Sequence, residues 1–429
     1  MFAQKAPAIV NRTMWKKSWP THLIWLFILS MVVGGVTVLL TTVTSKTSKA
    51  SQAEPLANPI YFPFIAQQTV IGRRLGYGVT QAPLTRYADL DSLRAGWYVD
   101  WGVNPHPALP GGIEYVQTVR VHQKLACGAT HHSNRNACPY AQPLDYVYSP
   151  DAATIVAAVQ ANPGSLWLIG NEMDRLDWAY CGEWLDTICQ KVLYDGQDEI
   201  LPETYAAVYH TLYTLIKQTD PTAKLAIGGV IQPTPLRLAY ITKIWDSYQT
   251  QYSTTMPVDV WNVHNFIIQE KAHEYGADIP PGVNASEGNY VGALRTHIDL
   301  NIFAQQIHDF RQWMKDHGQQ NKPLIVSEYG VLYSNDLMGF SATDPQVVQN
   351  FMVGSFNYFL NTKDCALGLP TDDCRLVQRW NWYSLEDANG TFNPYGRLFD
   401  PQSLQITATG EEFRAFVMQY MDVLRKTGC

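Results

Sequence analysis

The chain has few charged residues and no excess of positive charge. Only 16% of its 429 residues are charged, and the formal net charge is −7. Nucleic-acid binding needs a basic face, so no nucleic-acid partner is expected. No Gly-x-Gly-x-x-Gly motif and no phosphate-binding Lys loop occur, which argues against a nucleotide cofactor. The sequence also lacks an internal repeat.

Acidic residues are absent from the N-terminus, where the first one is Glu54, whereas basic residues begin at Lys5. From Leu23 to Val43 nearly every residue is apolar, Thr, Ser or Gly, and about 20 such residues cross a bilayer. The positive-inside rule then keeps the N-terminus in the cytosol and exports the rest. We predict a cytosolic basic segment at 1–21, a transmembrane signal anchor at 22–43, a flexible tether at 44–58 and a folded extracytoplasmic domain at 59–429.

A cleaved signal peptide is the alternative, because Ser51-Gln52-Ala53 has the small residues of a cleavage site and cleavage would secrete the domain. The apolar segment is longer than the usual signal core of about 7–15 residues, which favours an uncleaved anchor.

The seven cysteines all follow the predicted anchor, and six of them form three close pairs in sequence. Export favours disulfides, so we expect Cys127–Cys138, Cys181–Cys189 and Cys365–Cys374, with Cys429 left over. A zinc site in the segment from Cys127 through His131 and His132 to Cys138 is the alternative, although the spacing fits no standard zinc pattern.

Apolar strands alternate with amphipathic helices along the predicted domain, the pattern of a parallel sheet. Eight strand–helix units fit a (β/α)8 TIM barrel better than a doubly wound sheet. The eight candidate strands are RLGYGVT, AGWYVDWG, EYVQTVRVH, LWLIG, KLAIGGV, VDVWNVHNF, PLIVSEYG and LVQRWNWYSLED.

Polar residues follow the ends of these strands, where barrel enzymes carry their catalytic groups. Glu172 and Glu328 close two apolar strands, and a carboxylate there is costly unless it is paired or used. Side chains alternate between the two faces of a strand, so Glu172 shares a face with Leu168 and Gly170, and Glu328 shares a face with Leu324 and Val326. We predict that both of these faces point inward. The other candidates at strand ends, which we predict to bind the substrate, are Trp101, His122, Asn171, His264, Tyr329, Trp380 and Trp382.

Two carboxyl groups flanked by aromatic, amide and imidazole side chains suit glycosidic bond cleavage. One carboxylic acid protonates the leaving oxygen, and the other carboxylate attacks or stabilises the anomeric carbon. Aromatic faces can stack on sugar rings, and Asn can hold a sugar hydroxyl. The sequence therefore predicts a carbohydrate substrate and no metal or organic cofactor.

Gly170-Asn171-Glu172 and Ser327-Glu328-Tyr329-Gly330 together resemble the signature strands of clan A glycoside hydrolases, and WYVDWG resembles the Trp-rich strand of some glucanase-like members. This resemblance implies that Glu172 is the acid/base and Glu328 the nucleophile of a retaining mechanism. It also implies that Asn171 binds the 2-hydroxyl, that Trp382 or else Trp380 forms the floor of the −1 subsite, and that His264 is the strand-6 histidine.

One position departs from the resemblance. Two residues after that histidine many members have a Tyr that bonds the nucleophile, but this chain has Phe266, so Tyr329 or Tyr383 is the candidate replacement. His122 and His264 also have an alternative role as core histidines.

Two other functions compete with a hydrolase. A catalytically silent barrel would bind glycan at the cell surface, whereas a metal-dependent hydrolase would use His122, His264 and the carboxylates as ligands. The metal-dependent alternative lacks the H-x-H spacing typical of strand 1. No obligate protein partner is evident.

Overall fold

The computed structural model describes residues 72–80, 83–132, 134–177, 197–387 and 390–427. All of them belong to the compact unit Phe64–Cys429. The predicted segments 1–21, 22–43 and 44–58 lie outside the described residues, as do Cys429 and the predicted pair Cys181–Cys189. No helix among the described residues is long and apolar enough to span a membrane. The anchor at 22–43 therefore stays a prediction.

Two hydrogen-bonded sheets form the centre of this unit, with strand orders β3-β2-β1-β10-β9-β8 and β5-β4-β6-β7. Every pairing is parallel except that of β5 with β4. The strands are β1 (Leu75–Gly78), β2 (Trp97–Val99), β3 (Glu114–Tyr115), β4 (Gln117–Gln123), β5 (Tyr146–Ser149), β6 (Leu166–Asn171), β7 (Lys224–Gly229), β8 (Trp261–His264), β9 (Leu324–Gly330) and β10 (Arg379–Tyr383).

The two sheets connect at both edges. β3 and β4 are one extended run interrupted only at Val116, whose N–H still donates to the Tyr98 carbonyl at 3.0 Å. Parallel bridges from Ala226 to Val260 and from Val230 to Val263 join β7 to β8. The mixed α/β fold with a parallel sheet that the sequence predicts is confirmed, and the pairing around the ring is consistent with a TIM-barrel-like arrangement.

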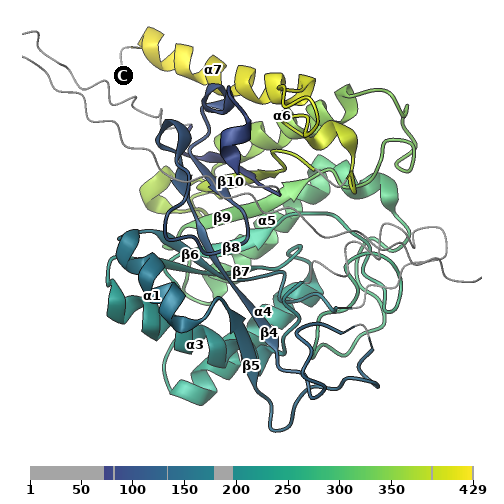
Figure 1. The fold of residues 1–429 in the computed structure, drawn as a ribbon. Coiled ribbons are helices and arrows are strands. Elements are labelled where there is room, and N and C mark those ends of the chain that lie inside the picture. Colours follow the sequence, from purple (N-terminus) through teal and green to yellow (C-terminus); the bar gives the residue numbers. More distant parts are fainter. Residues whose placement is uncertain (1–71, 81–82, 133, 178–196, 388–389, 428–429) are drawn as a thin grey trace, which may run out of the picture. The chain divides into compact units, whose positions relative to one another are not determined.

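The α-helices lie outside the strands and follow the later ones in alternation (Figure 1). Successive helices pack on one another, α1 on α3, α3 on α4, α5 on α6 and α6 on α7. In the described part of the chain, the links from β1 to β2 and from β2 to β3 contain only 3-10 turns. The helices are α1 (Ala152–Ala161), α3 (Pro202–Thr219), α4 (Pro235–Tyr252), α5 (Leu300–Asp316), α6 (Gln346–Asn361) and α7 (Ala408–Thr427).

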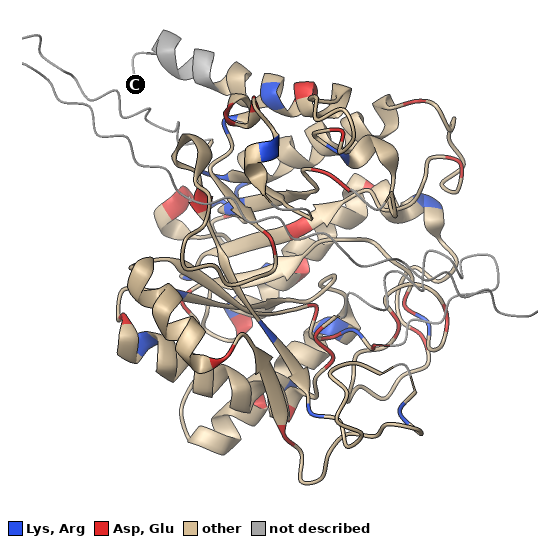
Figure 2. Ribbon diagram, viewed as in Figure 1, with Lys and Arg blue, Asp and Glu red and all other residues tan. Residues whose placement is uncertain are grey.

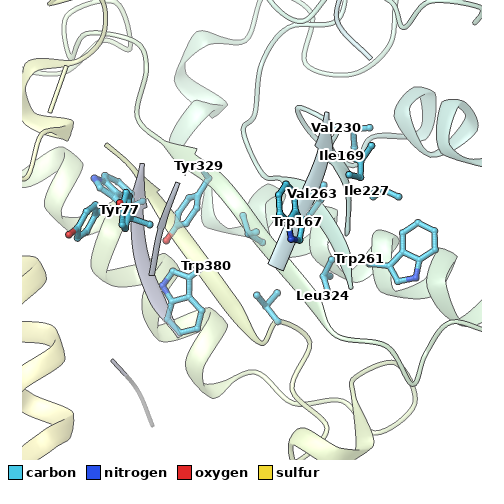
Figure 3. Close-up of a cluster of buried hydrophobic side chains, with 14 of the residues drawn as sticks. Tyr77, Trp167, Ile169, Ile227, Val230, Trp261, Val263, Leu324, Tyr329 and Trp380 are labelled. Carbon is cyan, nitrogen blue, oxygen red and sulfur yellow. The ribbon is translucent and has the colours of Figure 1, made fainter. Parts of the chain in front are cut away.

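Most of the buried apolar side chains form two separate layers. The larger layer lies between strands and helices and includes Trp167, Trp261, Tyr329 and Trp380 (Figure 3). The smaller layer contains residues of the strands and of the segments that flank them, and no helix residue, so it lies inside the ring. Its members are Trp97, Val99, Val116, Leu166, Leu168, Ala226, Val260 and Ile325. This inner cluster shows which residues of β2, β6, β7 and β9 point inward.

Candidate active site

Glu172 and Glu328 meet at the C-terminal ends of β6 and β9, with His264 from the end of β8 between them. One acceptor or donor atom of each of the three lies within 4.8 Å of the other two. His264 Nδ1 is 3.1 Å from Glu172 Oε1, and His264 Nε2 is 3.8 Å from Glu328 Oε2. Acidic and basic residues are interspersed over the helices and loops (Figure 2). At the strand ends Glu172 is buried and the Glu328 side chain is only 12% exposed, so both carboxyl groups are largely removed from water.

The end of β6 has an irregular backbone that presents Glu172. Leu166 and Leu168 belong to the inner cluster, so Glu172 shares their parity as predicted. Gly170 has a φ of 92°, a region that a side chain would strain, and Glu172 itself has a φ of 46°. A non-glycine residue in the left-handed region at a strand end is a feature of functional sites.

Glu328 reaches the same space by a different route from the one predicted. Leu324 and Val326 pack against the helices, whereas Ile325 belongs to the inner cluster, so simple alternation would point Glu328 outward. The pairing registers of β9 with both β8 and β10 shift between Val326 and the residues that follow. This bulge, which adds one residue to β9, turns Glu328 inward. The predicted inward face of Leu324 and Val326 was therefore wrong, although the position of Glu328 was right.

His264 occupies space that a glycine leaves open on the neighbouring strand. A Cβ on Gly229 would lie 2.3 Å from His264 Cδ2, closer than real Cβ atoms approach. The imidazole is 1% exposed and fits against the backbone of β7. Gly229 is therefore part of the reason that the imidazole can lie between the two carboxyl groups.

Trp101 supplies the direct hydrogen bond to Glu328. Its Nε1 donates to Glu328 Oε2 at 3.0 Å, and its backbone φ is 57°. A Cβ on Gly78 would lie 2.9 Å from the indole, so this glycine also makes room. Phe266, which has no hydroxyl, packs instead with Ile231, Ile268 and Ala277.

Burial and one neighbouring cation give the two carboxyl groups opposite pKa shifts. Burial acts to raise the pKa of Glu172, but the Arg175 guanidinium and the His264 hydrogen bond outweigh it, and the pKa lies below its ordinary value. At Glu328 burial exceeds the attraction of His264, and the charge of Glu172 adds to it, which raises the pKa to about 7.

Burial acts to lower the pKa of His264, but the charges of Glu328 and Glu172 prevail and raise it overall. The contacts of the site without substrate thus favour negative charge on Glu172 more than on Glu328. This is the reverse of the ionisation that the resemblance implies for the start of the reaction.

Three of the predicted substrate-binding residues point away from the pair. Trp382 and Trp380 are both 0% exposed, and the Trp382 Nε1 donates to the Gly396 carbonyl. Tyr329 is buried against helix α6, with its hydroxyl 3.1 Å from Ser355 Oγ. The prediction of a subsite floor at Trp382 or Trp380 was wrong, because these residues occupy the strand–helix layer.

Tyr383, the next residue of β10, faces the site instead. Its ring centroid is 5.8 Å from that of Trp101, and burial together with the charge of Glu328 raises its pKa well above the ordinary value. Side chains alternate between the two faces of a strand. Because Trp382 faces the helices, the next residue, Tyr383, faces the interior of the ring.

Arg175 is the main residue that sequence reasoning missed. Its Nη1 is 3.1 Å from Glu172 Oε2, and its Nη2 donates to the Gly276 carbonyl at 3.0 Å. The sequence signal was its position three residues after Glu172. Asp198 was also missed, and it accepts the backbone N–H of Asn171 at 2.8 Å.

Two further predicted residues have protein partners of their own. Asn171 lies beside Glu172 and donates through Nδ2 to Gln197 Oε1 at 3.1 Å, and its binding of a 2-hydroxyl stays a prediction. His122 is not brought to the carboxyl pair, because its Nε2 is 2.9 Å from Asp177 Oδ1 in a separate cluster.

Two groups of three side chains have the composition of a metal site among the described residues, namely Glu172–His264–Glu328 and His122–His131–Asp177. In the first group, Arg175 and Trp101 already bond one oxygen of each carboxylate. Cys127 and Cys138 form a disulfide, and so do Cys365 and Cys374, as predicted. The alternative zinc site that used those first two cysteines is therefore wrong.

The solved structures to which this chain is similar include glycoside hydrolases and an oligosaccharide-binding protein. A GH128 subgroup VII oligosaccharide-binding protein from Trichoderma gamsii has 14% identity and a TM-score of 0.43, covering 82% of this chain and 95% of that one. A GH128 subgroup I endo-beta-1,3-glucanase from Amycolatopsis mediterranei, solved with laminaritriose, has 17% identity and a TM-score of 0.42, covering 80% and 99%. A glucosidase from Croceicoccus marinus has 13% identity and a TM-score of 0.44, covering 81% and 67%.

No protein-family model and no curated protein matches this chain. At such low identities and TM-scores, the structural likenesses do not by themselves give this chain an activity.

Proposed function

We propose that this protein is a glycoside hydrolase that cleaves O-glycosidic bonds of a poly- or oligosaccharide with Glu172 and Glu328 as the reacting pair. The observation that carries the proposal is that two buried carboxyl groups from β6 and β9 bring oxygens within 4.8 Å of each other. Burial of two carboxyl groups this close disfavours the fully ionised pair, so they share a proton. Sharing a proton is what an acid acting together with a nucleophile or base requires.

The spacing favours a retaining mechanism. Retaining enzymes hold the two carboxyl groups about 5–5.5 Å apart, whereas inverting enzymes leave about 6.5–9.5 Å for a water molecule. Here one oxygen of each carboxyl group lies within 4.8 Å of the other, which agrees better with the shorter, retaining separation. We therefore propose double displacement through a covalent glycosyl–enzyme intermediate.

The roles follow the sequence resemblance, with Glu172 as acid/base and Glu328 as nucleophile. The form of the pair that reacts carries one proton, and its two apparent pKa values belong to the pair as a whole. In that form the proton must move from Glu328 to Glu172 before attack. His264 contacts Glu172 and lies 3.8 Å from Glu328, so it is placed to stabilise either arrangement.

The residues around Glu328 suit attack on an anomeric carbon. The Trp101 N–H bond stabilises the ionised form of Glu328 and fixes the orientation of the carboxylate. The rings of Trp101 and Tyr383 supply aromatic faces beside the pair, of the kind that stack on a sugar ring.

Kinetics of two variants test the activity and the roles. Glu328→Gln should abolish turnover of every glycoside, because it removes the nucleophile. Glu172→Ala should slow substrates with poor leaving groups most, since an activated aryl glycoside needs little protonation. Azide should then rescue Glu172→Ala and give a glycosyl azide of retained configuration. Glu411→Gln, which removes an exposed carboxylate on α7, is the control for the loss of charge.

The outcomes separate the alternatives. Rescue of Glu328→Ala with retained configuration would reverse the two roles. If the wild type and both variants bind glycan equally but none cleaves any member of a broad polysaccharide panel, the protein is a silent glycan-binding barrel.

We further propose that the hydrolase faces the outside of the cell on the anchor at 22–43 and that Cys181–Cys189 forms the third disulfide. Carbonate extraction should leave the chain in the membrane fraction, and protease added to intact cells should digest the domain. Release of the chain into the medium would indicate a cleaved signal peptide instead. Non-reducing peptide mapping tests the disulfide.

A further inference from the structure

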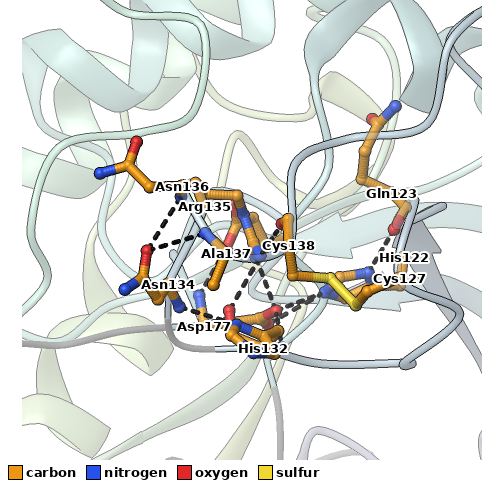
Figure 4. Close-up of a disulfide and its surroundings, with 11 residues drawn as sticks. His122, Gln123, Cys127, His132, Asn134, Arg135, Asn136, Ala137, Cys138 and Asp177 are labelled. Atoms are coloured by element: carbon orange, nitrogen blue, oxygen red, sulfur yellow. Dashed lines mark hydrogen bonds and ion pairs between the residues drawn. A yellow bond between two sulfur atoms is a disulfide. The ribbon is translucent and has the colours of Figure 1, made fainter.

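A second cluster of ionisable side chains lies at the base of the loop closed by Cys127–Cys138 (Figure 4). His122 comes from the end of β4, His131 from the disulfide loop, and Asp177 from the segment that follows β6. His122 Nε2 and His131 Nδ1 lie 2.9 Å and 3.1 Å from the same oxygen, Asp177 Oδ1. The two imidazole rings meet edge to face, with centroids 4.5 Å apart.

The hydrogen bonds of His122 show that positive charge is needed between its ring and Asp177. Its Nδ1 is 2.6 Å from the Gln123 carbonyl oxygen, which can only accept, so Nδ1 carries a hydrogen. In a neutral ring Nε2 then has only a lone pair, and it faces a carboxylate oxygen that also has only lone pairs. Either a second proton or a metal cation has to lie between these two atoms.

The neighbouring residues hold each donor as outer-shell residues hold metal ligands. The Gln123 carbonyl fixes the ring of His122, which is the common arrangement for a histidine bound through its other nitrogen. The second oxygen of Asp177 accepts from Arg135 at 2.7 Å and from the His132 backbone N–H at 3.0 Å. Asp177 Oδ1 accepts neither of these bonds and faces both imidazoles, and His122 Nε2 also lies 3.1 Å from the second oxygen.

Arg135 has a second carboxylate partner in this cluster, Glu199, which neutralises its charge. Its Nε and Nη2 also bond Glu199, at 2.9 Å and 2.7 Å, and Tyr140 donates to the same carboxylate. Arg135 thus neutralises Glu199, and at Asp177 it contacts Oδ2 and not Oδ1. Asp177 Oδ1 is therefore left to a different cationic partner.

We propose that His122 Nε2, His131 Nδ1 and Asp177 Oδ1 bind a divalent zinc ion. Two imidazole nitrogens and one carboxylate oxygen are zinc donors, and they disfavour Mg²⁺ and Ca²⁺, which prefer all-oxygen shells. The three atoms lie within 4.8 Å of one another, and zinc at about 2.0–2.2 Å from each needs only small adjustments of the side chains. The His131 side chain is 31% exposed, so an ion can enter past it and keep a water as fourth ligand.

This zinc is separate from the proposed hydrolysis and has a structural consequence. It joins β4, the disulfide loop and the segment after β6, three parts of the chain that lie next to the strand carrying Glu172. The zinc site considered from the sequence would have had Cys127 and Cys138 as ligands. The proposed site uses neither sulfur and is compatible with the disulfide.

Zinc binding by the purified full chain tests the proposal. After treatment with chelator and dialysis, the chain is titrated with ZnCl₂, and bound metal is measured by mass spectrometry alongside the thermal unfolding temperature. We expect one zinc per chain, a higher unfolding temperature, release of protons on binding and weaker binding at low pH. MgCl₂ at the same concentration should give no stabilisation.

Two neighbouring histidines provide a matched pair of variants. His131→Gln removes a half-buried ligand and should weaken zinc binding by at least about tenfold, as loss even of an outer-shell partner does. His132→Gln should leave binding unchanged, because His132 Nδ1 accepts only from the Asn134 backbone N–H in this cluster. His131→Gln without zinc should unfold at the temperature of the metal-free wild type.

The proposal is overturned if the wild-type chain binds no zinc at near-stoichiometric concentration, or if both variants lose it equally. A proton then lies between His122 and Asp177, and the cluster is an ion-pair network. Glycan hydrolysis does not enter these measurements, so failure of the zinc site and failure of the proposed function are distinguishable.

Discussion

Replacing Arg175 by Gln is expected to move the acid limb of the pH–activity profile toward higher pH. The guanidinium Nη1 is 3.1 Å from Glu172 Oε2, and the two side chains are 14% and 4% exposed. At an effective dielectric constant of about 20, this contact is worth about 5 kcal/mol before desolvation is counted. An Arg beside a carboxyl group lowers the carboxyl pKa by about 1–3 units, so its removal should raise the pKa of Glu172 by that amount.

The direction of the pH shift depends on which protonation state of the Glu172–Glu328 pair reacts. On the acid side, activity is lost when the pair takes up its second proton, which goes to Glu172. Without Arg175 this second proton binds at higher pH, so the acid limb should rise by about 1–3 pH units. The alkaline limb should rise less, because Arg175 contacts Glu172 directly and is only a minor influence on Glu328.

Measurement of kcat/KM from about pH 4 to pH 9 reports the pKa values of the free enzyme. Arg414→Gln, which removes an equal charge from a half-exposed pair with Glu411 on α7, should leave both limbs in place. The reasoning is refuted if Arg175→Gln is active and its acid limb coincides with that of the wild type. An equal shift in Arg414→Gln would mean that net charge, and not the contact, controls the pair.

Three other perturbations give distinct results. Glu328→Gln should stabilise the fold at pH 8 by up to about 3 kcal/mol in denaturant unfolding, because the pKa of Glu328 is raised from 4.5 to about 7 and its ionised form is disfavoured above that pH. The gain should vanish below pH 4, where Glu328 is protonated in both states, and an equal gain at both pH values would contradict this origin. Trp101→Phe keeps an aromatic face but loses the N–H donor to Glu328, so the alkaline limb should rise while the unfolding midpoint stays nearly constant. Gly229→Ala should displace His264 and reduce kcat, since the new Cβ would lie 2.3 Å from the ring, whereas Gly102→Ala meets only an ordinary contact at 3.4 Å and should be tolerated.

Much of the fold was predictable from local patterns in the sequence. The eight predicted strands contain the parallel strands of the ring, because strands buried on both faces are continuous apolar runs. Helices over the first two crossovers could not be ruled out from the sequence. There the chain forms 3-10 turns in which Leu84, Leu90 and Leu93 are buried, and the turn Leu90–Leu93 packs on α7.

The site was predictable only in part. Glu172, Glu328 and His264 were found because ionisable residues at the ends of buried strands are unusual. Trp382 and Trp380 were misplaced because a strand with alternating side chains can turn either set of residues inward. Which set points inward depends on the register with the neighbouring strands, which the sequence does not give. The same ambiguity hid Tyr383, which occupies the inward phase of β10.

By itself the sequence determined the order of the strands and helices, the two nearby cysteine pairs that the structure describes, and the identity of the carboxyl groups that close β6 and β9. These depend on local composition and spacing, which one sequence displays directly. Tertiary structure alone decided that a bulge turns Glu328 inward and that Trp101 bonds it from across the ring. It also decided that Arg175 lies beside Glu172 and lowers the pKa of that carboxyl group. Burial and contacts between distant segments set these properties, because the energy of a charge depends on the groups that surround it in space.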